Sequence, residues 1–443
     1  MSFPKYDRCK NSGVEWLGEV PEHWKMKKLK HVTNICLSNI DKHTVEGQQR
    51  VSLCNYLDVY RNERISSSIN FMQATASDDQ IERLGLIEGD VIITKDSEDP
   101  SDIGVPALIV ENIPNLVCGY HLALIRSKET NGEFLHYLFC SNFVRSIFET
   151  EATGLTRYAL GKYSIENLTF AVPPLPEQRS IATFLDRETT KIDELIAEQR
   201  QLIDLLKEKR QAVISHAVTK GLNPDAPMKD SAIEWLGEVP EHWEVIHLRR
   251  AISASDYGIS DSLDSVGEIP VLRMGNILSG NIVLEDLKYV DKVDEELLLT
   301  SGDVLFNRTN SLDLIGKVGV FRAEQFDRIT FASYLVRLRF RSVDLPEYMG
   351  YLLNTNSILG EARSYALVSI GQCNLNPTRY AYIRIPLPPS EEQKEIIAFL
   401  DRETAKFDEL IAETHHAIAL LRERRTALIS AAVTGKIDVR SLV

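Results

Sequence analysis

Long apolar runs and paired cysteines are both missing from this sequence of 443 residues. No stretch of about 18 apolar residues could span a membrane, and residues 1–5 lack the apolar core of a signal peptide. The six cysteines form no Cys-x-x-Cys pair and are spaced differently in the two halves. We therefore expect reduced thiols in a cytoplasmic protein, without disulfides or a zinc site.

The usual sequence signatures of a catalytic site are missing as well. None of the three Gly-Lys pairs is followed by the Ser or Thr of a phosphate-binding loop. No glycine-rich loop follows a predicted strand, the Asn-Pro-Pro-aromatic motif of amino-methyltransferases is absent, and His and Cys do not cluster at metal-ligand spacing. The sequence thus predicts no active site, no metal and no cofactor bound by this chain.

What the sequence does contain is a repeat. Residues 14–24, Val-Glu-Trp-Leu-Gly-Glu-Val-Pro-Glu-His-Trp, return 219 positions later as residues 233–243, with Ile in place of the first Val. We call these two segments the Trp markers. The Phe-Leu-Asp-Arg-Glu-Thr of residues 184–189 returns 215 positions later. Because a long, poorly matching insert separates the two motifs in each half, the pattern indicates one duplicated scaffold that presents two different inserts.

Both inserts are predicted to mix strands and helices. The predicted elements are two Gly-Asp turns, each followed by a β-rich run (91–94 and 304–306), a half-buried strand (334–340) and two matching helices (132–139 and 346–353). A proline cluster, residues 173–176 and 386–389, then ends each insert. The two inserts are therefore predicted to share one fold.

A long helix is predicted after each proline cluster, over residues 177–219 and 392–434. Apolar residues recur there at alternating three- and four-residue steps, which is the pattern of a coiled-coil seam. The seam residues are Leu185, Ile192, Leu195, Leu202, Leu206 and Val213 in the first helix and Leu400, Phe407, Leu410, Leu421 and Leu428 in the second, widened by Ile196, Ile203, Ile411 and Ile418. We expect the two seams to cover each other in an antiparallel pair.

These elements predict an α+β protein with a pseudo-two-fold internal repeat. Two mixed α/β insert domains would be joined by two long helices that pack as an antiparallel coiled coil. The predicted segments are the first marker (1–24), the first insert domain (25–175), the central spacer helix (176–221), a linker with the second marker (222–243), the second insert domain (244–389) and the C-terminal spacer helix (390–443).

The formal net charge of −14 argues against a free-standing nucleic-acid binder, because phosphate contacts require Lys and Arg. A local basic face, or cations from a partner subunit, would still permit such binding. The candidate contacts are Lys27, Lys28, Lys95, Arg157 and Tyr158 in the first insert and Arg273, Asn276, Arg308, Asn310, Gln372 and Asn374 in the second. Arg forks onto guanine or phosphate, and Asn or Gln pairs with adenine. Salt-bridged arginines and turn-forming asparagines would give the same pattern, so this alternative stays open.

Near-identical residues in the two halves would also suit two equal docking sites for two copies of one partner. The candidates are Trp16, Trp24, Trp235 and Trp243 in the markers and Asp193, Glu194, Asp408 and Glu409 in the helices. Packing within the scaffold is the simpler explanation for the tryptophans. It explains the repeated acidic stretches less well, because acidic residues on a helix surface are not needed for packing.

The arrangement of these motifs resembles the specificity subunit of Type I restriction–modification systems. The resemblance rests on the Trp marker that opens each half, on the Glu-Gln after each proline cluster (177–178 and 392–393) and on the Ala-Val-Thr that ends each long helix (217–219 and 432–434). It also includes the duplicated Phe-Leu-Asp-Arg-Glu-Thr, and it covers nearly the whole chain.

The resemblance implies a non-catalytic reader of double-stranded DNA. Each insert would be a target-recognition domain that contacts one half of a split, asymmetric site, and the long helices would hold the two domains apart. Two modification subunits, which use S-adenosylmethionine to form N6-methyladenine, would dock on the paired regions. Added restriction subunits would make a nuclease that depends on ATP and Mg.

Two other classes of protein stay open from the residues alone. A two-headed coiled-coil adaptor would bind proteins through its inserts and would show no sequence-dependent DNA binding. A self-contained methyltransferase would bind S-adenosylmethionine without a partner.

Four residues inserted near Leu202 are predicted to lengthen the gap between the two half-sites without changing the half-sites themselves. Four helical residues add roughly 6 Å, which approaches the length of two base pairs at about 3.4 Å each. Mapping the methylated sites made by a complex that carries this variant measures the gap. An unchanged gap would contradict the idea that the helices act as a ruler.

Overall fold

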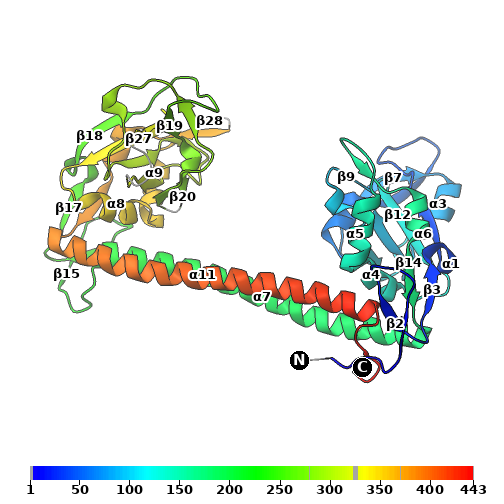
Figure 1. Ribbon diagram of the computed structural model, residues 1–443. Helices are drawn as coiled ribbons and strands as arrows, with labels where there is room; N and C mark the ends of the chain where they lie inside the picture. Colours follow the sequence, from blue (N-terminus) through cyan, green and yellow to red (C-terminus); the bar gives the residue numbers. More distant parts are fainter. Residues whose placement is uncertain (1–2, 279, 323–327, 370, 443) are drawn as a thin grey trace. The chain divides into compact units, whose positions relative to one another are not determined.

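The chain forms two compact units, each built around one of the predicted inserts (Figure 1). The computed structural model describes residues 3–278, 280–322, 328–369 and 371–442. Unit 1 comprises Met1–Arg200 with His415–Val443, and unit 2 comprises Gln201–Thr414. Each unit therefore combines one insert domain, one Trp marker and a part of each long helix.

The insert domain of unit 1 is built on a five-stranded sheet. In order across the sheet, the strands are β4 (Thr33–Leu37), β12 (Leu122–Ser127), β8 (Val91–Thr94), β10 (Pro106–Ile109) and β6 (Arg64–Ile65). A second sheet, β11 (Leu116–Cys118), β5 (Gln49–Cys54) and β7 (Met72–Ala76), shares its apolar core. Helices α4 (Gly132–Cys140) and α5 (Asn142–Glu151) follow. All four residues of β8 are buried, as expected for a strand covered on both faces.

The insert domain of unit 2 repeats this plan. Its larger sheet has the order β18 (Ile252–Tyr257), β27 (Leu335–Phe340), β23 (Val304–Asn307), β25 (Val318–Val320), β21 (Asn281–Ile282) and β20 (Ile277–Leu278). The second sheet contains β22 (Lys288–Val290), β19 (Ile269–Leu272) and β26 (Thr330–Phe331), and helices α8 (Leu345–Leu353) and α9 (Asn356–Ser364) follow. Because β23 takes the place of β8 and α8 that of α4, the two inserts share one fold, as predicted.

The predicted Gly-Asp turn before each central strand is present in both units. Gly89 and Gly302 have φ angles of 86° and 92°, a conformation that residues other than glycine rarely adopt. Asp90, buried beside Gly89, accepts hydrogen bonds from the backbone N–H of Ile87 and from Arg126. The duplicate Asp303 does the same in unit 2 with Thr300 and Arg339. A buried carboxylate that is hydrogen-bonded in this way fixes where each central strand begins.

The predicted half-buried strand at residues 334–340 is correct in position and wrong in burial. The first four residues of β27 are all buried, although Arg337 stands among them. Arg337 is 2% exposed and donates to Asp256 Oδ2 at 2.7 Å and to the carbonyl oxygens of Leu298 and Glu296. Because these partners satisfy its guanidinium, the alternation of apolar and polar residues did not indicate a solvent-exposed face.

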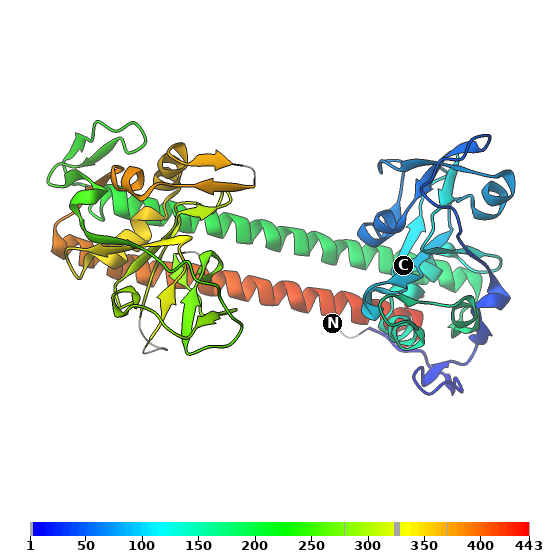
Figure 2. The same ribbon diagram turned by 90° about the horizontal axis from the view of Figure 1, so that it is seen from above.

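The two long helices are α7 (Leu175–Lys220) and α11 (Ser390–Val433), within two residues of the predicted bounds. They lie side by side within each unit (Figure 2). In unit 1 Arg425 pairs with Asp193 at 3.0 Å, and in unit 2 Arg210 pairs with Asp408 at 3.2 Å. The early half of α7 thus meets the late half of α11, and the late half of α7 meets the early half of α11. This is the antiparallel direction that was predicted.

The predicted seam on α7 needs a correction. Leu195 and Leu202 are 44% and 41% exposed, whereas Ile192, Ile196 and Ile203 are buried. On α11, Leu410 is also exposed, and Ile418 is buried. The predicted seam residues Leu185, Ile192, Leu400 and Leu428 are nevertheless buried. The buried face thus includes part of the predicted seam and is shifted towards Ile196 and Ile203 in the middle of α7.

Each Trp marker is hydrogen-bonded to the first turn of a long helix. In unit 1, the indole Nε1 of Trp24 donates to Glu177 at 3.0 Å and the His23 ring donates to the same carboxylate at 2.7 Å. In unit 2, Trp243 and His242 donate to Glu392 at 2.9 and 2.7 Å. A carboxylate in the first turn of a helix is also favoured by the helix dipole.

Each marker also holds the end of the other helix. In unit 1, the Nζ of Lys436, just beyond α11, donates to the carbonyl oxygens of Leu17 and Glu19 at 3.1 and 2.8 Å. In unit 2, Lys220 at the end of α7 donates to the carbonyl of Leu236 at 3.1 Å. The two marker contacts together therefore bring the start of one helix and the end of the other to the same place in each unit.

Replacing Glu177 with Gln is predicted to destabilise unit 1 by about 1–3 kcal/mol. The nearly buried carboxylate accepts from Tyr6, His23 and Trp24, and an amide would turn one acceptor into a donor. Urea unfolding followed by tryptophan fluorescence measures the loss. The matched control is Glu198→Gln, at an exposed position on the same helix, and an equal effect of the two substitutions would contradict this role for Glu177.

Candidate functional site

The candidate site in each unit begins where the central strand ends. Lys95 directly follows β8, and Arg308 directly follows β23. The backbone N–H of Lys95 donates to the carbonyl of His121 at 2.9 Å, and that of Arg308 donates to the carbonyl of Tyr334 at 3.1 Å. The same backbone contact thus places a basic residue at the same position of both domains.

A second loop joins the first in both units. In unit 1, β9 (Asp96–Ser97) pairs with β13 (Tyr158–Ala159), and in unit 2, β24 (Thr309–Asn310) pairs with β29 (Gln372–Asn374). Seven of the eleven predicted nucleic-acid contacts are brought together in this way. They are Lys95, Arg157 and Tyr158 in unit 1, which we call loop cluster 1, and Arg308, Asn310, Gln372 and Asn374 in unit 2, loop cluster 2.

In loop cluster 1 the lysine is held by an ion pair. Lys95 Nζ lies 2.6 Å from Asp96 Oδ2, which also accepts from His121 Nδ1 at 2.8 Å. Burial alone would raise the pKa of Asp96, but the hydrogen bonds from Lys95 and His121 outweigh it and lower that pKa below its usual value. Arg157 is exposed and its Nη2 lies 3.4 Å from the other ring nitrogen of His121. The charge most accessible to a ligand here is therefore that of Arg157.

In loop cluster 2 the basic group is held by an aromatic ring. The guanidinium of Arg308 lies 5.1 Å from the ring centre of Tyr257, and none of the ion pairs among the described residues includes it. Gln372 is exposed, and Asn374 accepts from the Thr309 hydroxyl at 2.8 Å through its oxygen, which leaves its NH₂ group to donate elsewhere. Arginine, glutamine and asparagine are the side chains that pair with base edges.

The remaining predicted contacts lie elsewhere. Lys27 and Lys28, on β3 (Lys25–Lys28), bond to Glu129 and Asn167, and β3 pairs with the strand that leads into α7. Arg273 donates to the Asp286 carbonyl at 2.5 Å. The prediction of Asn276 as a nucleic-acid contact needs a correction, because this residue is buried. Its NH₂ donates to two carbonyls and its oxygen accepts from the N–H of Arg273. It is a structural residue.

Sequence reasoning missed the residues that surround the two basic groups. The backbone contacts and the aromatic rings beside Lys95 and Arg308 come from Tyr120, His121, Tyr257 and Tyr334. His121 has a φ angle of 50°, which is uncommon for a residue other than glycine. The signal in the sequence was an aromatic residue just before the strand that pairs with the central one. That signal can be recognised only once the pairing of the strands is known.

The predicted docking tryptophans are mostly interior residues. Trp24 and Trp243 are fully buried, so they belong to the scaffold contact with Glu177 and Glu392 and cannot face a partner. Trp235 is partly buried against the core of unit 2. Trp16 is 43% exposed and stacks on Phe143 with ring centres 4.6 Å apart. Only Trp16 of the four thus offers an extended aromatic surface.

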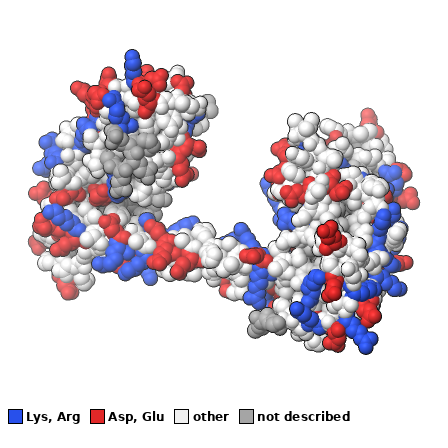
Figure 3. Space-filling model, in the orientation of Figure 1, with Lys and Arg blue, Asp and Glu red and all other residues white. Residues whose placement is uncertain are grey.

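The four acidic candidates on the long helices are all exposed. Asp193 and Asp408 take part in the ion pairs with Arg425 and Arg210. On the face shown in Figure 3, acidic and basic side chains are interspersed along the helices and over both units. The charge on this face is thus mixed rather than of one sign.

Two further properties concern the described part of the chain. Within it, no group of three or more His, Cys, Asp or Glu could hold a metal ion. No helix there is both long enough and apolar enough to cross a membrane.

Fold and site together define a protein with two recognition domains, which carry different side chains on one duplicated frame. The chain belongs to the Type I restriction modification DNA specificity domain family, whose model matches residues 21–205 and again residues 240–419. It is thus a specificity subunit of a Type I restriction–modification system, as the sequence motifs predicted.

Known proteins agree with this assignment. The chain is 24% identical over 361 residues to the Type I restriction enzyme EcoKI specificity subunit of Escherichia coli (strain K12), covering 79% of this chain and 75% of that protein. It is 26% identical over 317 residues to the MjaVIII specificity subunit of Methanocaldococcus jannaschii, covering 69% and 71%. A chain from a solved structure of a type I R-M system has the same fold, with a TM-score of 0.68 and 15% identity over 94% of this chain and 98% of that one.

Proposed function

We propose that each unit reads one half of a bipartite, asymmetric sequence in double-stranded DNA through its loop cluster. The observation that carries this proposal is the different chemistry on an identical frame. Lys95 and Arg308 follow duplicated strands, make the same backbone contact and each lie 5.1 Å from a tyrosine ring centre. Lys95 is in addition ion-paired to Asp96, whereas Arg308 takes part in none of the ion pairs among the described residues. Two readers that differ in this way would select two different half-sites.

The side chains of the two clusters suit different parts of a DNA site. Arg157 and Tyr158, exposed and half-buried in unit 1, suit phosphate and sugar contacts that position the duplex. Arg308, Gln372 and Asn374 suit base edges, because a guanidinium matches guanine and an amide matches adenine. The negative charge of the chain as a whole would then be offset by cations of a partner.

The chain would act without catalysis of its own. Two modification subunits would dock on it and supply S-adenosylmethionine chemistry that forms N6-methyladenine, and restriction subunits would add an activity that uses ATP and Mg. The long helices, packed as an antiparallel coiled coil, would be the spacer between the two readers. Trp16, Glu194 and Glu409 are exposed and are the remaining candidates for contacts with the modification subunits.

Co-expression with the cognate modification subunit in a host without adenine methylation tests this function. We expect N6-methyladenine at a split, asymmetric motif, mapped by long-read sequencing, that disappears when this chain is omitted. A stable complex with an active methyltransferase subunit but no motif would favour the two-headed protein adaptor. Binding of S-adenosylmethionine by this chain alone would favour the self-contained methyltransferase.

Replacing Arg308 with Ala is predicted to relax one half of the methylated motif and to leave the other half unchanged. The loss of a base contact costs about 1–3 kcal/mol, or roughly a 5- to 150-fold loss of methylation at the intact site. Arg250→Ala is the matched control, because this exposed arginine follows β17 (Glu244–His247), whose partner strand leads into α11. Equal effects of the two substitutions, or relaxation of both half-sites, would argue against Arg308 as a reader.

A further inference from the structure

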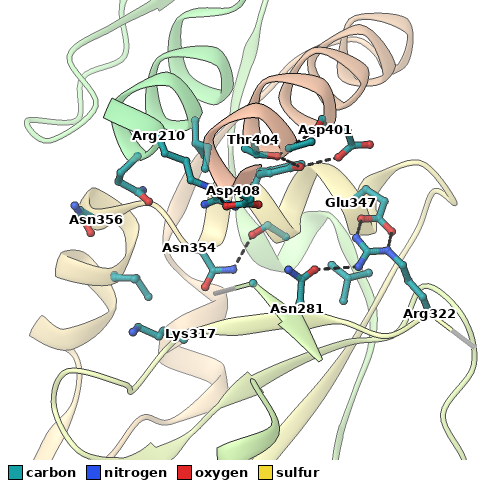
Figure 4. Close-up of a pocket in the computed structure, with 18 residues that line it drawn as sticks. Arg210, Asn281, Lys317, Arg322, Glu347, Asn354, Asn356, Asp401, Thr404 and Asp408 are labelled. Carbon is teal, nitrogen blue, oxygen red and sulfur yellow. Dashed lines mark hydrogen bonds and ion pairs between the residues drawn. The ribbon is translucent and has the colours of Figure 1, made fainter. Parts of the chain in front are cut away.

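Unit 2 contains a cavity of about 580 Å³ between its insert domain and the two long helices (Figure 4). Arg210 comes from α7, and Asp401 and Asp408 come from α11. Asn281 and Arg322 face them from the insert domain. The lining is therefore polar and carries charges of both signs.

The duplicated fold allows the lining of this cavity to be compared with the corresponding place in unit 1. In unit 1, Leu108 of β10 lies opposite Arg64 of β6, and in unit 2, Val320 of β25 lies opposite Asn281 of β21. The N–H of Leu108 donates to the carbonyl of Glu63, as that of Val320 donates to the carbonyl of Gly280. Asn281 thus takes the place of Arg64, and Gly280 takes the place of Glu63.

In unit 1, these two larger side chains reach the long helices and form ion pairs with them. Arg64 forms an ion pair with Asp186 of α7. Glu63 pairs with Arg425 of α11 at 2.6 Å, and Arg425 pairs in turn with Asp193. The arginine of the insert domain thus binds an aspartate on α7, and the neighbouring glutamate binds an arginine on α11.

In unit 2, the long helices keep the corresponding aspartate and arginine, Asp401 and Arg210. The insert domain has no arginine and glutamate at the two positions that would bind them. Asp401 lies 215 positions after Asp186 and accepts a hydrogen bond from Tyr351 at 2.6 Å. No Lys or Arg among the described residues lies within ion-pair distance of it. The nearby Arg322 is held by Glu347 at 2.5 Å and by Asn281 at 3.2 Å. The carboxylate of Asp401 therefore faces the cavity without the cation that its duplicate has.

We propose that this cavity binds the guanidinium group of an arginine side chain that a modification subunit contributes, with Asp401 as its acceptor. The proposal rests on the proposed function, in which such subunits dock on this chain. A planar guanidinium fits a carboxylate through two parallel hydrogen bonds, which the ammonium of a lysine cannot make. In unit 1, the pair of Arg64 and Asp186 shows that the corresponding aspartate accepts from an arginine, there through one guanidinium nitrogen.

A partner chain is the favoured source because of where Asp401 lies. It belongs to the Phe-Leu-Asp-Arg-Glu-Thr stretch, which is identical in the two halves. Unit 1 uses its copy of the aspartate for an internal arginine, whereas unit 2 leaves its copy open. The two docking sites are therefore unequal, in contrast to the equal sites that the repeated sequence predicted, and the site on unit 2 gains one charge-assisted contact.

Asn281→Arg tests the proposal by restoring the internal arginine of unit 1 at the position of unit 2. Measured by titration of the purified subunits, the wild-type chain is expected to bind two modification subunits in steps of different affinity. Asn281→Arg and Asp401→Asn should each weaken the tighter step at least about tenfold and leave the other step unchanged. Val343→Arg is the matched control for an added arginine, at a fully accessible position outside the cavity.

The outcomes separate this proposal from the proposed function. Two modification subunits that bind equally well to the wild type, Asn281→Arg and Asp401→Asn would overturn the cavity as an arginine site and leave the DNA-reading function intact. Failure of the wild-type chain to bind any modification subunit would overturn the proposed function and the partner source together.

A second measurement tests the chemistry of the cavity without the partner. N-acetyl-arginine amide and N-acetyl-lysine amide are each titrated into the chain at constant ionic strength. The wild type should bind the arginine compound more tightly, and Asn281→Arg should bind the two compounds equally. No preference for the guanidinium would overturn the proposal. A preference combined with unchanged subunit binding in both variants would assign the cavity to a small guanidinium ligand and would overturn the partner as its source.

Discussion

The contact on which this structure depends is the clamp that an indole and an imidazole form on one glutamate at the start of each long helix. Glu177 and Glu392 accept from a tryptophan and a histidine of the adjacent Trp marker. Because a buried indole N–H and a buried carboxylate are both costly to leave unpaired, neither marker nor helix can shift independently. The lysine at or just beyond the end of the opposite helix then binds the same marker. Each marker thereby fixes the direction of both helices relative to one insert domain.

This clamp explains why the scaffold is repeated almost letter for letter while the inserts differ. Each marker as a whole contacts two helices, one through its Trp and His side chains and the other through backbone carbonyls, and so tolerates little change in its path. A residue such as Lys95 or Arg308 is fixed through its backbone, by a hydrogen bond to the residue before the neighbouring strand. The backbone position is therefore set without the side chain, although the Lys95 side chain also has an ion pair with Asp96. In the proposed function, specificity would change at such positions while the frame is kept, in the way that loops on a rigid scaffold generally allow.

Features that depend on near neighbours in the sequence were predictable, and features that depend on strand register or helix rotation were not. The Gly-Asp turns and the ends of α7 and α11 are encoded locally, and they were predicted correctly. Arg337 was misjudged because its partners lie on segments about 40 and 81 residues away. Asn276 was misjudged because its side-chain amide donates to the backbone of the loop that follows it, at Val283. The exposed Leu195 and buried Ile196 differ by one position on a helix, a rotation that a heptad pattern does not determine when both residues are apolar. The residues of loop clusters 1 and 2 were named as candidates from the sequence, but their grouping could not be predicted, because it depends on the pairing of β9 with β13 and of β24 with β29.

The contact between Lys436 and Leu17 spans 419 positions of the chain, and this separation has a consequence for synthesis. Unit 1 needs residues from both ends of the chain, so the first recognition domain emerges from the ribosome long before the helix that completes it. At about 5–20 residues per second, the translation of unit 2 takes on the order of ten to forty seconds. During that interval the buried face of the early part of α7 has no α11 beside it. Unit 1 is therefore completed only after residues 415–442 have been made, and until then part of its helix interface is exposed.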